Sequence, residues 1–312
     1  MGNAFAQQHN EARAEAEWHE SVRLRPDLTD AHRALAGLEL RRGDVEAVFQ
    51  SAQQIIKAEP NLPDGYILKG IAELARQKYD DARQDAEQAA SRAPQNPAPS
   101  IQLGNIQMAQ KHYAEAATFY QQALDKDPSS TEALSGLMNT YIAEKQPDKA
   151  IAAARAQIAK SPNDSDFYDL LGTALFNAKK DLPGADAALH KAIELNKNNV
   201  DALEKLGKVQ IQEGATDQAL ALYQQSIKDN PQEVIFYILC GELYESRKDW
   251  DHAKSMYQQA LNVSPDHPLA SNNLAYVILE QGGNVDVAMG MAQTARPVSY
   301  THLRAHETGR NL

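Results

Sequence analysis

Side chains that could bind a metal ion occur at two places in the chain, and neither place has a complete set of ligands. His302 and His306 are four residues apart, which would turn both rings to one side of a helix, but no third ligand accompanies them. Asp164, Asp166 and Asp169 resemble the spacing of a calcium-binding loop, yet the turn glycine and the closing glutamate of such a loop are missing. We interpret these aspartates as a helix-capping cluster and expect no metal site.

The other histidines and the single cysteine do not form a catalytic site. No serine, cysteine or aspartate recurs beside the scattered histidines His32, His112, His190 and His252. Cys240 is the sole cysteine among 312 residues, so it forms no intrachain disulfide, and we expect it to fill the core. The sequence therefore predicts a protein without enzymatic activity and without a cofactor.

A recurring proline shows how the elements of the chain are organised. It returns every 34 residues and, after one step of 69 residues, resumes the same period. The positions are Pro26, Pro60, Pro94, Pro128, Pro162, Pro231 and Pro265. A fixed spacing of this length indicates one short unit that cannot bury its own apolar face, copied and stacked so that each copy covers the next.

Small residues keep the same period. If each proline is repeat position 32, position 8 is Gly or Ala in eight of nine copies (Met138 excepted), and position 20 is Ala in eight of nine (Val48 excepted). This register allows one inserted residue near Leu182 and another near Gly282. Large residues occupy position 24 in several copies, namely Trp18, Tyr120, Leu189, Tyr223 and Tyr257. Because small side chains let two helices approach closely, we expect position 8 to pack against position 20 in an antiparallel helix pair.

Prolines and an asparagine mark the expected starts of several helices. Pro63, Pro97 and Pro268 fall at first helical positions, and Asn96 precedes one of them as an N-cap. No stretch alternates between apolar and polar residues with a period of two, so the sequence predicts no strand.

A 34-residue helix-turn-helix unit with Gly at position 8, Ala at 20, an aromatic residue at 24 and Pro at 32 resembles the tetratricopeptide repeat family, as found in bacterial proteins with many repeats. The resemblance covers residues 1 to about 296. It implies an all-α fold, specifically a right-handed α-solenoid (superhelix) of antiparallel helix pairs.

The repeat register divides the chain into segments. It predicts a partial repeat in residues 1–28, seven complete repeats in 29–267 and a truncated last repeat in 268–296. Pro297 falls where a helix should still be running, and an interior proline costs about 3 kcal/mol. We expect residues 297–312 to be a non-native tail, because they resemble translated adapter sequence at the ends of metagenomic reading frames. The exposed ends of the stack predict fraying or self-association.

Charge and hydropathy limit the kinds of partner. The net charge of −11 argues against nucleic-acid binding, because no dense stripe of Lys and Arg is present. No apolar run is long enough to insert directly into a membrane, so we expect this segment to be soluble. Whether it resides in the cytoplasm or the periplasm is left open by the sequence.

The family resemblance implies that partners bind on the concave face, at positions 2, 5, 9, 12 and 13 of each first helix. At position 9, neighbouring repeats carry Asn105 and Asn139, whose amides offer a donor and an acceptor to the backbone of an extended peptide. The same track is expected to continue through Arg33, Arg41, Asn177, Lys208, Asn272 and Tyr276. The alternative is that these residues are solvated polar positions without a partner.

Apolar residues give this groove a hydrophobic part, which suits an amphipathic helix or an extended segment. They are Ile67, Ile71, Leu74 and Ile101. Some family members grip chaperone tails with a clamp of Lys, Asn and Arg side chains. Ile101 and Ser135 stand at position 5 beside the two asparagines, so the sequence disfavours that mode.

Two classes of function follow. The first is a non-catalytic protein–protein interaction scaffold that binds a peptide or a helix segment in the concave groove. The second is a targeting or substrate-recruiting arm of a larger enzyme, such as a glycosyltransferase or a protease. A further alternative, a role in exopolysaccharide or surface-protein export, rests on the NNLAY sequence that begins at Asn272 and on the Gly-Gly insertion after it.

Overall fold

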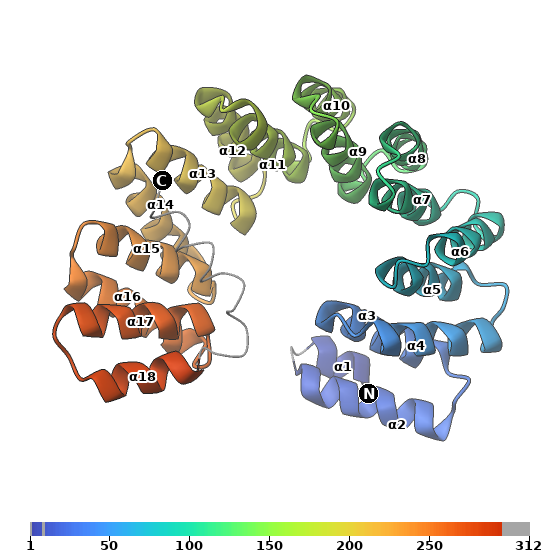
Figure 1. The fold of residues 1–312 in the computed structure, drawn as a ribbon, viewed down its shortest axis with the longest axis horizontal. Helices are drawn as coiled ribbons and strands as arrows, with labels where there is room; N and C mark the ends of the chain where they lie inside the picture. Colours follow the sequence, from blue (N-terminus) through green and yellow to red (C-terminus); the bar gives the residue numbers. More distant parts are fainter. Residues whose placement is uncertain (1, 8–9, 295–312) are drawn as a thin grey trace. The chain divides into compact units, whose positions relative to one another are not determined.

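The computed structural model describes residues 2–7 and 10–294, and every regular element in this part of the chain is a helix (Figure 1). The helices are α1 (Gly2–Gln7), α2 (Glu11–Leu24), α3 (Thr29–Arg42), α4 (Val45–Ala58), α5 (Pro63–Ala75), α6 (Tyr79–Arg92), α7 (Ala98–Ala109), α8 (Tyr113–Lys126), α9 (Thr131–Ala143), α10 (Pro147–Lys160), α11 (Ser165–Ala174), η1 (Leu175–Lys179), α12 (Leu182–Leu195), α13 (Val200–Gln212), α14 (Thr216–Asp229), α15 (Val234–Ser246), α16 (Trp250–Val263), α17 (Pro268–Glu280) and α18 (Val285–Thr294). The prediction of an all-α fold without strands is confirmed for the described residues.

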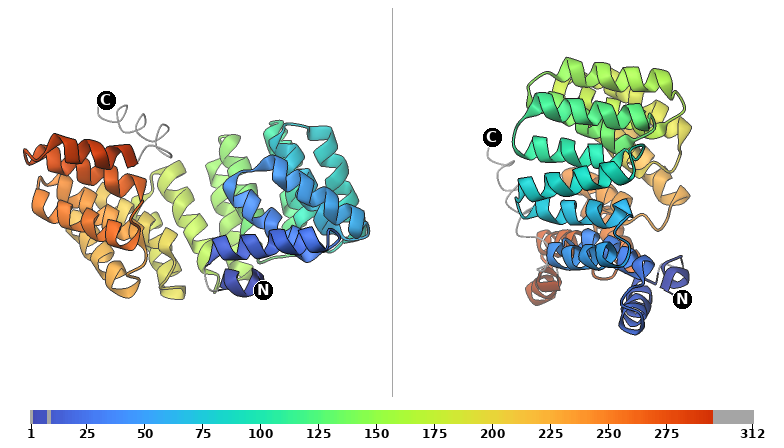
Figure 2. Two further views of the ribbon diagram at one scale, coloured as in Figure 1. Left: turned by 90° about the horizontal axis from the view of Figure 1, so that it is seen from below. Right: turned by 90° about the vertical axis from the view of Figure 1, so that its right-hand side faces the viewer.

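The chain forms two compact units, Met1–Leu170 and Leu171–Leu312. In the first unit, each helix from α1 to α10 packs against the next one along the chain, and Figure 2 shows these helices stacked in layers. In the second unit, the helices from α12 to α18 pack in the same sequential way. Each unit is therefore a solenoid of helix pairs, as the repeat period predicts. The predicted repeat limits stay a prediction, and residues 297–312 lie outside the described part.

From α3 to α18, the turn inside each helix pair contains a residue in the left-handed conformation, with φ between 57° and 82°. These residues are Gly43, Gln77, Lys111, Lys145, Lys180, Gly214, Lys248 and Gly282. They recur with the repeat period at position 15, where a left-handed residue lets the last carbonyl groups of the first helix find donors. Five of them are Gln or Lys, which are not typical of the left-handed conformation, so residue type did not predict this turn.

One repeat has an extra residue, which the structure places in a π-helical turn. The segment η1 (Leu175–Lys179) continues α11, and the left-handed Lys180 follows it at a distance of 35 residues from Lys145. The sequence register put this insertion near Leu182, and the structure shows that it lies just upstream, because a π-helical turn absorbs one residue without ending the helix. The second insertion, predicted near Gly282, is the loop residue Gly283 before the N-cap Asn284.

Small residues at positions 8 and 20 lie inside the helix pairs. At position 20, the alanines Ala14, Ala82, Ala116, Ala150, Ala185, Ala219 and Ala253 are all 0% exposed. A Cβ on Gly70 would lie 3.3 Å from the main-chain oxygen of Ala82, so position 8 faces position 20 as predicted. A Cβ on Gly207 would lie 2.2 Å from the ring of Tyr223. Where position 24 carries a large ring, position 8 must therefore be small for that residue as well.

The predicted helix starts are mostly confirmed. Pro63 and Pro268 are the first residues of α5 and α17. Helix α7 begins at Ala98, one residue later than expected, although Pro97 already has helical angles (φ −71°, ψ −27°). Asn96 Oδ1 accepts a hydrogen bond from the main-chain N–H of Ala98 at 2.9 Å, which confirms its role at this helix start.

Candidate functional site on the first helices

The candidate site is the first-helix face, which we define as the side chains at repeat positions 2, 5, 9, 12 and 13 of α3, α5, α7 and α9 in the first unit and of α13, α15 and α17 in the second. In the first unit α5 contacts α7, and α7 contacts α9, while the second helices α6, α8 and α10 lie on the opposite side of the stack (Figure 1). In the second unit α15 contacts α17 in the same manner. In these three pairs, neighbouring first helices therefore lie side by side.

Asn105 and Asn139 lie on the adjacent helices α7 and α9 and differ in their surroundings. Asn105 is half-buried, and its Oδ1 accepts a hydrogen bond of 2.5 Å from the hydroxyl of Tyr120. Asn139 is exposed, and its Nδ2 lies 3.5 Å from Oγ of Ser135. The two predicted amides lie on adjacent helices, and of the two only Asn105 makes a short hydrogen bond.

The two predicted arginines of the first unit are engaged within the chain. Arg33 contacts Asp30 on α3 and Asp64 on α5, each with an N–O distance of 2.7 Å. Arg41 extends from α3 to Glu11 on α2, with an N–O distance of 2.8 Å. Both arginines are substantially exposed, so these ion pairs contribute little to stability.

The second unit contains the remaining predicted residues. Lys208 is exposed and pairs with Glu204 one turn earlier on α13, at 2.5 Å. The Tyr276 ring packs edge-on against Trp250, with centroids 6.4 Å apart, while Asn272 is half-buried on the same helix, α17. Asn177 is exposed but lies in the π-helical turn η1. Counting along the sequence puts Asn177 at position 13 of its repeat, as Arg41 is in its own repeat. Because η1 contains the inserted residue, the two side chains are not in equivalent places in the structure.

The apolar part of the predicted face is partly accessible. Ile67, Ile71 and Leu74 on α5 are half-buried. Ile101 on α7 is only 4% exposed, because the neighbouring helices cover it, so it serves the core and offers almost no surface to a partner. The expected hydrophobic portion is thus provided by α5 alone.

A buried polar cluster between α5, α6 and α7 escaped the sequence reasoning. Lys69 Nζ lies 2.9 Å from a carboxylate oxygen of Asp85 and 3.5 Å from one of Glu73. Glu73, Asp85 and Gln102 are 4%, 5% and 6% exposed. Burial, followed by the hydrogen bond and the negative charge of Asp85, raises the pKa of Glu73 to about 7. The sequence contained one sign of this cluster, because Lys69 lies at position 7, where most other copies have Leu.

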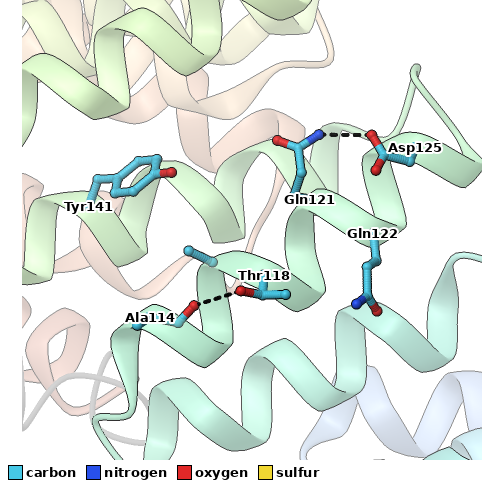
Figure 3. Close-up of a pocket in the computed structure, with 7 residues that line it drawn as sticks. Ala114, Thr118, Gln121, Gln122, Asp125 and Tyr141 are labelled. Carbon is cyan, nitrogen blue, oxygen red and sulfur yellow. Dashed lines mark hydrogen bonds between the residues drawn. The ribbon is translucent and has the colours of Figure 1, made fainter.

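A cavity of about 490 Å³ lies along the second helix α8 (Figure 3). It is lined by Ala114, Ala117, Thr118, Gln121, Gln122, Asp125 and Tyr141. Gln121 donates to Asp125 at 3.0 Å, and Thr118 donates to the main-chain oxygen of Ala114 at 3.0 Å, so part of the polar lining is already satisfied. None of the predicted partner-binding residues lines this cavity.

Asp164 and Cys240 have structural roles. Asp164 Oδ1 accepts from the main-chain N–H of Asp166 at 3.0 Å and of Phe167 at 3.4 Å, which confirms the helix-capping interpretation for Asp164, while Asp166 and Asp169 lie within α11. Cys240 is 0% exposed, as predicted for a core residue, and burial raises its pKa to about 12, so the thiol is not a nucleophile near neutral pH.

Among residues 2–7 and 10–294, every helix is too short or too polar to span a lipid bilayer. His302 and His306 lie outside the described residues.

Comparison with known families agrees with the repeat period. Profiles described as tetratricopeptide repeat match residues 67–131, 107–173, 177–243 and 239–297. The chain belongs to the tetratricopeptide repeat family. The matches cover most of the span over which the sequence resembles this family, and they confirm the resemblance.

Solved structures and a curated protein are similar to this tetratricopeptide repeat chain. A tetratricopeptide repeat protein from Parabacteroides merdae is 18% identical, covers 78% of this chain and 96% of its own, and has a TM-score of 0.52, which shows the shared fold. The Cut9–Hcn1 heterotetramer of the anaphase-promoting complex is 17% identical over 97% of this chain and 59% of that one, with a TM-score of 0.49. Anaphase-promoting complex subunit 3 of Schizosaccharomyces pombe is 27% identical over 103 residues, which are 33% of this chain and 16% of that protein. The chain therefore spans only part of the length of the last two.

Proposed function

We propose that this tetratricopeptide repeat protein is a non-catalytic scaffold that binds a peptide or helical segment of a protein partner along its first-helix face. The fold is one used for protein–protein interaction. The observation that carries the finer proposal is the pair Asn105 and Asn139 on the contacting helices α7 and α9, together with half-buried Ile67 and Ile71 on α5, the first helix that contacts α7. The amides can form hydrogen bonds with the backbone of an extended peptide, and the apolar side chains can contact an apolar side chain of that peptide.

The nature of the partner follows from charge and from a relative. The net charge of −11 disfavours the phosphate backbone of a nucleic acid. One curated relative is by its name a subunit of a multiprotein complex, which supports a protein partner for this chain also. Arg33 and Arg41 keep their charges at the surface in ion pairs within the chain, and these two side chains favour an acidic group on the partner near α3.

The proposal is tested with peptides selected from a random library against the wild-type protein. The variant Asn105→Ala, Asn139→Ala, Lys208→Ala removes three polar side chains from the first-helix face. We expect it to weaken binding of the selected peptides by about tenfold or more, since several hydrogen bonds are lost together. The matched control Gln53→Ala, Gln84→Ala, Lys228→Ala removes two amides and one lysine that are exposed on second helices.

The control variant is expected to bind the peptides with wild-type affinity. Circular dichroism of both variants verifies that the helices are intact. If the two variants bind equally well, or if the control is the weaker binder, the first-helix face is not the binding surface and the proposal is wrong.

A further inference from the structure

The ring of Tyr120 is fixed by glycines on two neighbouring helices. Tyr120 belongs to α8 and is 2% exposed. A Cβ on Gly104 of α7 would lie 2.8 Å from this ring, and a Cβ on Gly136 of α9 would lie 2.3 Å from it. Only glycine leaves room for the ring at both places, so the tyrosine fits between α7 and α9 in one position.

The Tyr120 hydroxyl approaches the first-helix face from the second helix α8 and donates a hydrogen bond of 2.5 Å to Oδ1 of Asn105. Burial raises the pKa of Tyr120 to about 12, so its hydroxyl keeps its proton throughout the physiological pH range and remains a donor. The oxygen of the Asn105 amide is therefore turned toward the buried Tyr120 hydroxyl, which uses one of its two acceptor positions. Within the described part of the chain, the Nδ2 end makes no hydrogen bond.

We infer that Tyr120 is a positioning residue, which fixes the Asn105 amide as a hydrogen-bond donor and so makes this point of the first-helix face select a backbone carbonyl oxygen of the bound segment. This inference rests on the proposed function and specifies its chemistry. An amide whose oxygen is turned to a buried hydroxyl presents its two N–H groups, and these pair with a carbonyl oxygen in preference to a partner N–H. The adjoining Ile67 and Ile71 then receive an apolar side chain next to that carbonyl.

The next repeat lacks this arrangement. Position 24 there is Ala154, which has no hydroxyl, and Asn139 has only the 3.5 Å contact with Ser135. In the second unit, the equivalent Tyr223 donates to the main-chain oxygen of Glu204 at 3.0 Å and orients no side chain. Asn139 can thus rotate to donate or to accept, whereas Asn105 is held with its oxygen toward the buried Tyr120 hydroxyl and its Nδ2 group as the available donor.

The first test needs no partner. Tyr120→Phe removes the hydroxyl and keeps the ring between the two glycines, and Tyr223→Phe is the matched control at the same repeat position. In NMR spectra of ¹⁵N-labelled protein, the side-chain amide resonances of Asn105 are expected to move toward the values of a free amide in Tyr120→Phe and to stay unchanged in Tyr223→Phe. Unchanged Asn105 resonances in Tyr120→Phe would overturn the inference.

The second test uses a peptide selected against the wild-type protein. Tyr120→Phe is expected to weaken its binding about three- to tenfold, since a free amide must be ordered on binding. Asn105→Asp preserves the acceptor for Tyr120 and removes the N–H donors, so we expect it to bind at least as weakly as Asn105→Ala. Replacing one peptide bond at a time by a thioamide weakens a single carbonyl acceptor of the peptide. At one position this replacement should lower the affinity for the wild-type protein and leave the affinity for Asn105→Ala unchanged.

The outcomes separate the two proposals. If Asn105→Ala weakens binding while Asn105→Asp and Tyr120→Phe bind like the wild type, the face binds the peptide but the donor assignment is wrong. If none of these variants changes the affinity, the proposed function itself fails at this place, and the Asn105 resonances still show whether Tyr120 orients the amide in the free protein.

Discussion

Replacing Glu73 by glutamine is expected to stabilise the protein at pH 8 and to leave its stability almost unchanged near pH 4.5. Glu73 is 4% exposed and interacts with the charged groups of Lys69 on its own helix and of Asp81 and Asp85 on α6. An ionised Glu73 in this place is desolvated and lies next to the charge of Asp85. Glutamine has the shape of the neutral acid and carries no charge.

The magnitude follows from the pKa of Glu73, which rises from 4.5 to about 7 in the folded protein. Between these values the folded state retains a proton that the unfolded state has released, so the free energy of unfolding falls as the pH rises through this window. At about 1.4 kcal/mol per pH unit, the loss reaches at most about 3 kcal/mol above pH 7. Glu73→Gln should therefore gain up to about 3 kcal/mol over the wild type at pH 8.

Urea unfolding between pH 5 and pH 8 measures this difference. Because stability in a repeat array is local, unfolding is best followed by hydrogen exchange and mass spectrometry of peptides from α5 and α6. Glu87→Gln, an exposed change of the same kind on α6, is the control and should follow the wild-type pH dependence. A Glu73→Gln protein with the wild-type pH dependence, or with lower stability at pH 8, would refute the reasoning.

Three other predictions concern packing, the ends and the thiol. Gly207→Ala should destabilise the second unit by about 1–3 kcal/mol in urea unfolding, because the new methyl group would overlap a tyrosine ring. Gly37→Ala is the contrasting change, because no atom lies within 4 Å of its Cβ, and it should stabilise α3 by up to about 1 kcal/mol. Val285 and Met289 on α18 are 58% and 54% exposed, so the protein is expected to self-associate, and replacing both by Lys should lower the sedimentation-derived association constant. Equal constants for the two proteins would show that α18 is not involved. The thiol of Cys240 should react with a disulfide reagent only after unfolding in urea, and rapid labelling of the native protein would contradict its burial.

The sequence by itself determined the fold class and the packing of each helix pair. The prolines 34 residues apart, the small residue at position 8 and Ala at position 20 are properties of one unit, and every copy repeats them. Such a signal is readable because contacts within a helix pair join residues close in the chain, as Gly70 and Ala82 show. The family followed from the same pattern, and so did the burial of Cys240.

The tertiary structure decided what is particular to single repeats. Tyr120 reaches Asn105 only because Gly104 and Gly136 leave room for its ring, and the second of these glycines belongs to the next repeat. The charge cluster around Lys69 likewise depends on α5, α6 and α7 together. The period cannot reveal such contacts, because it records what the copies share, whereas a buried hydrogen bond depends on which side chains meet across neighbouring helices.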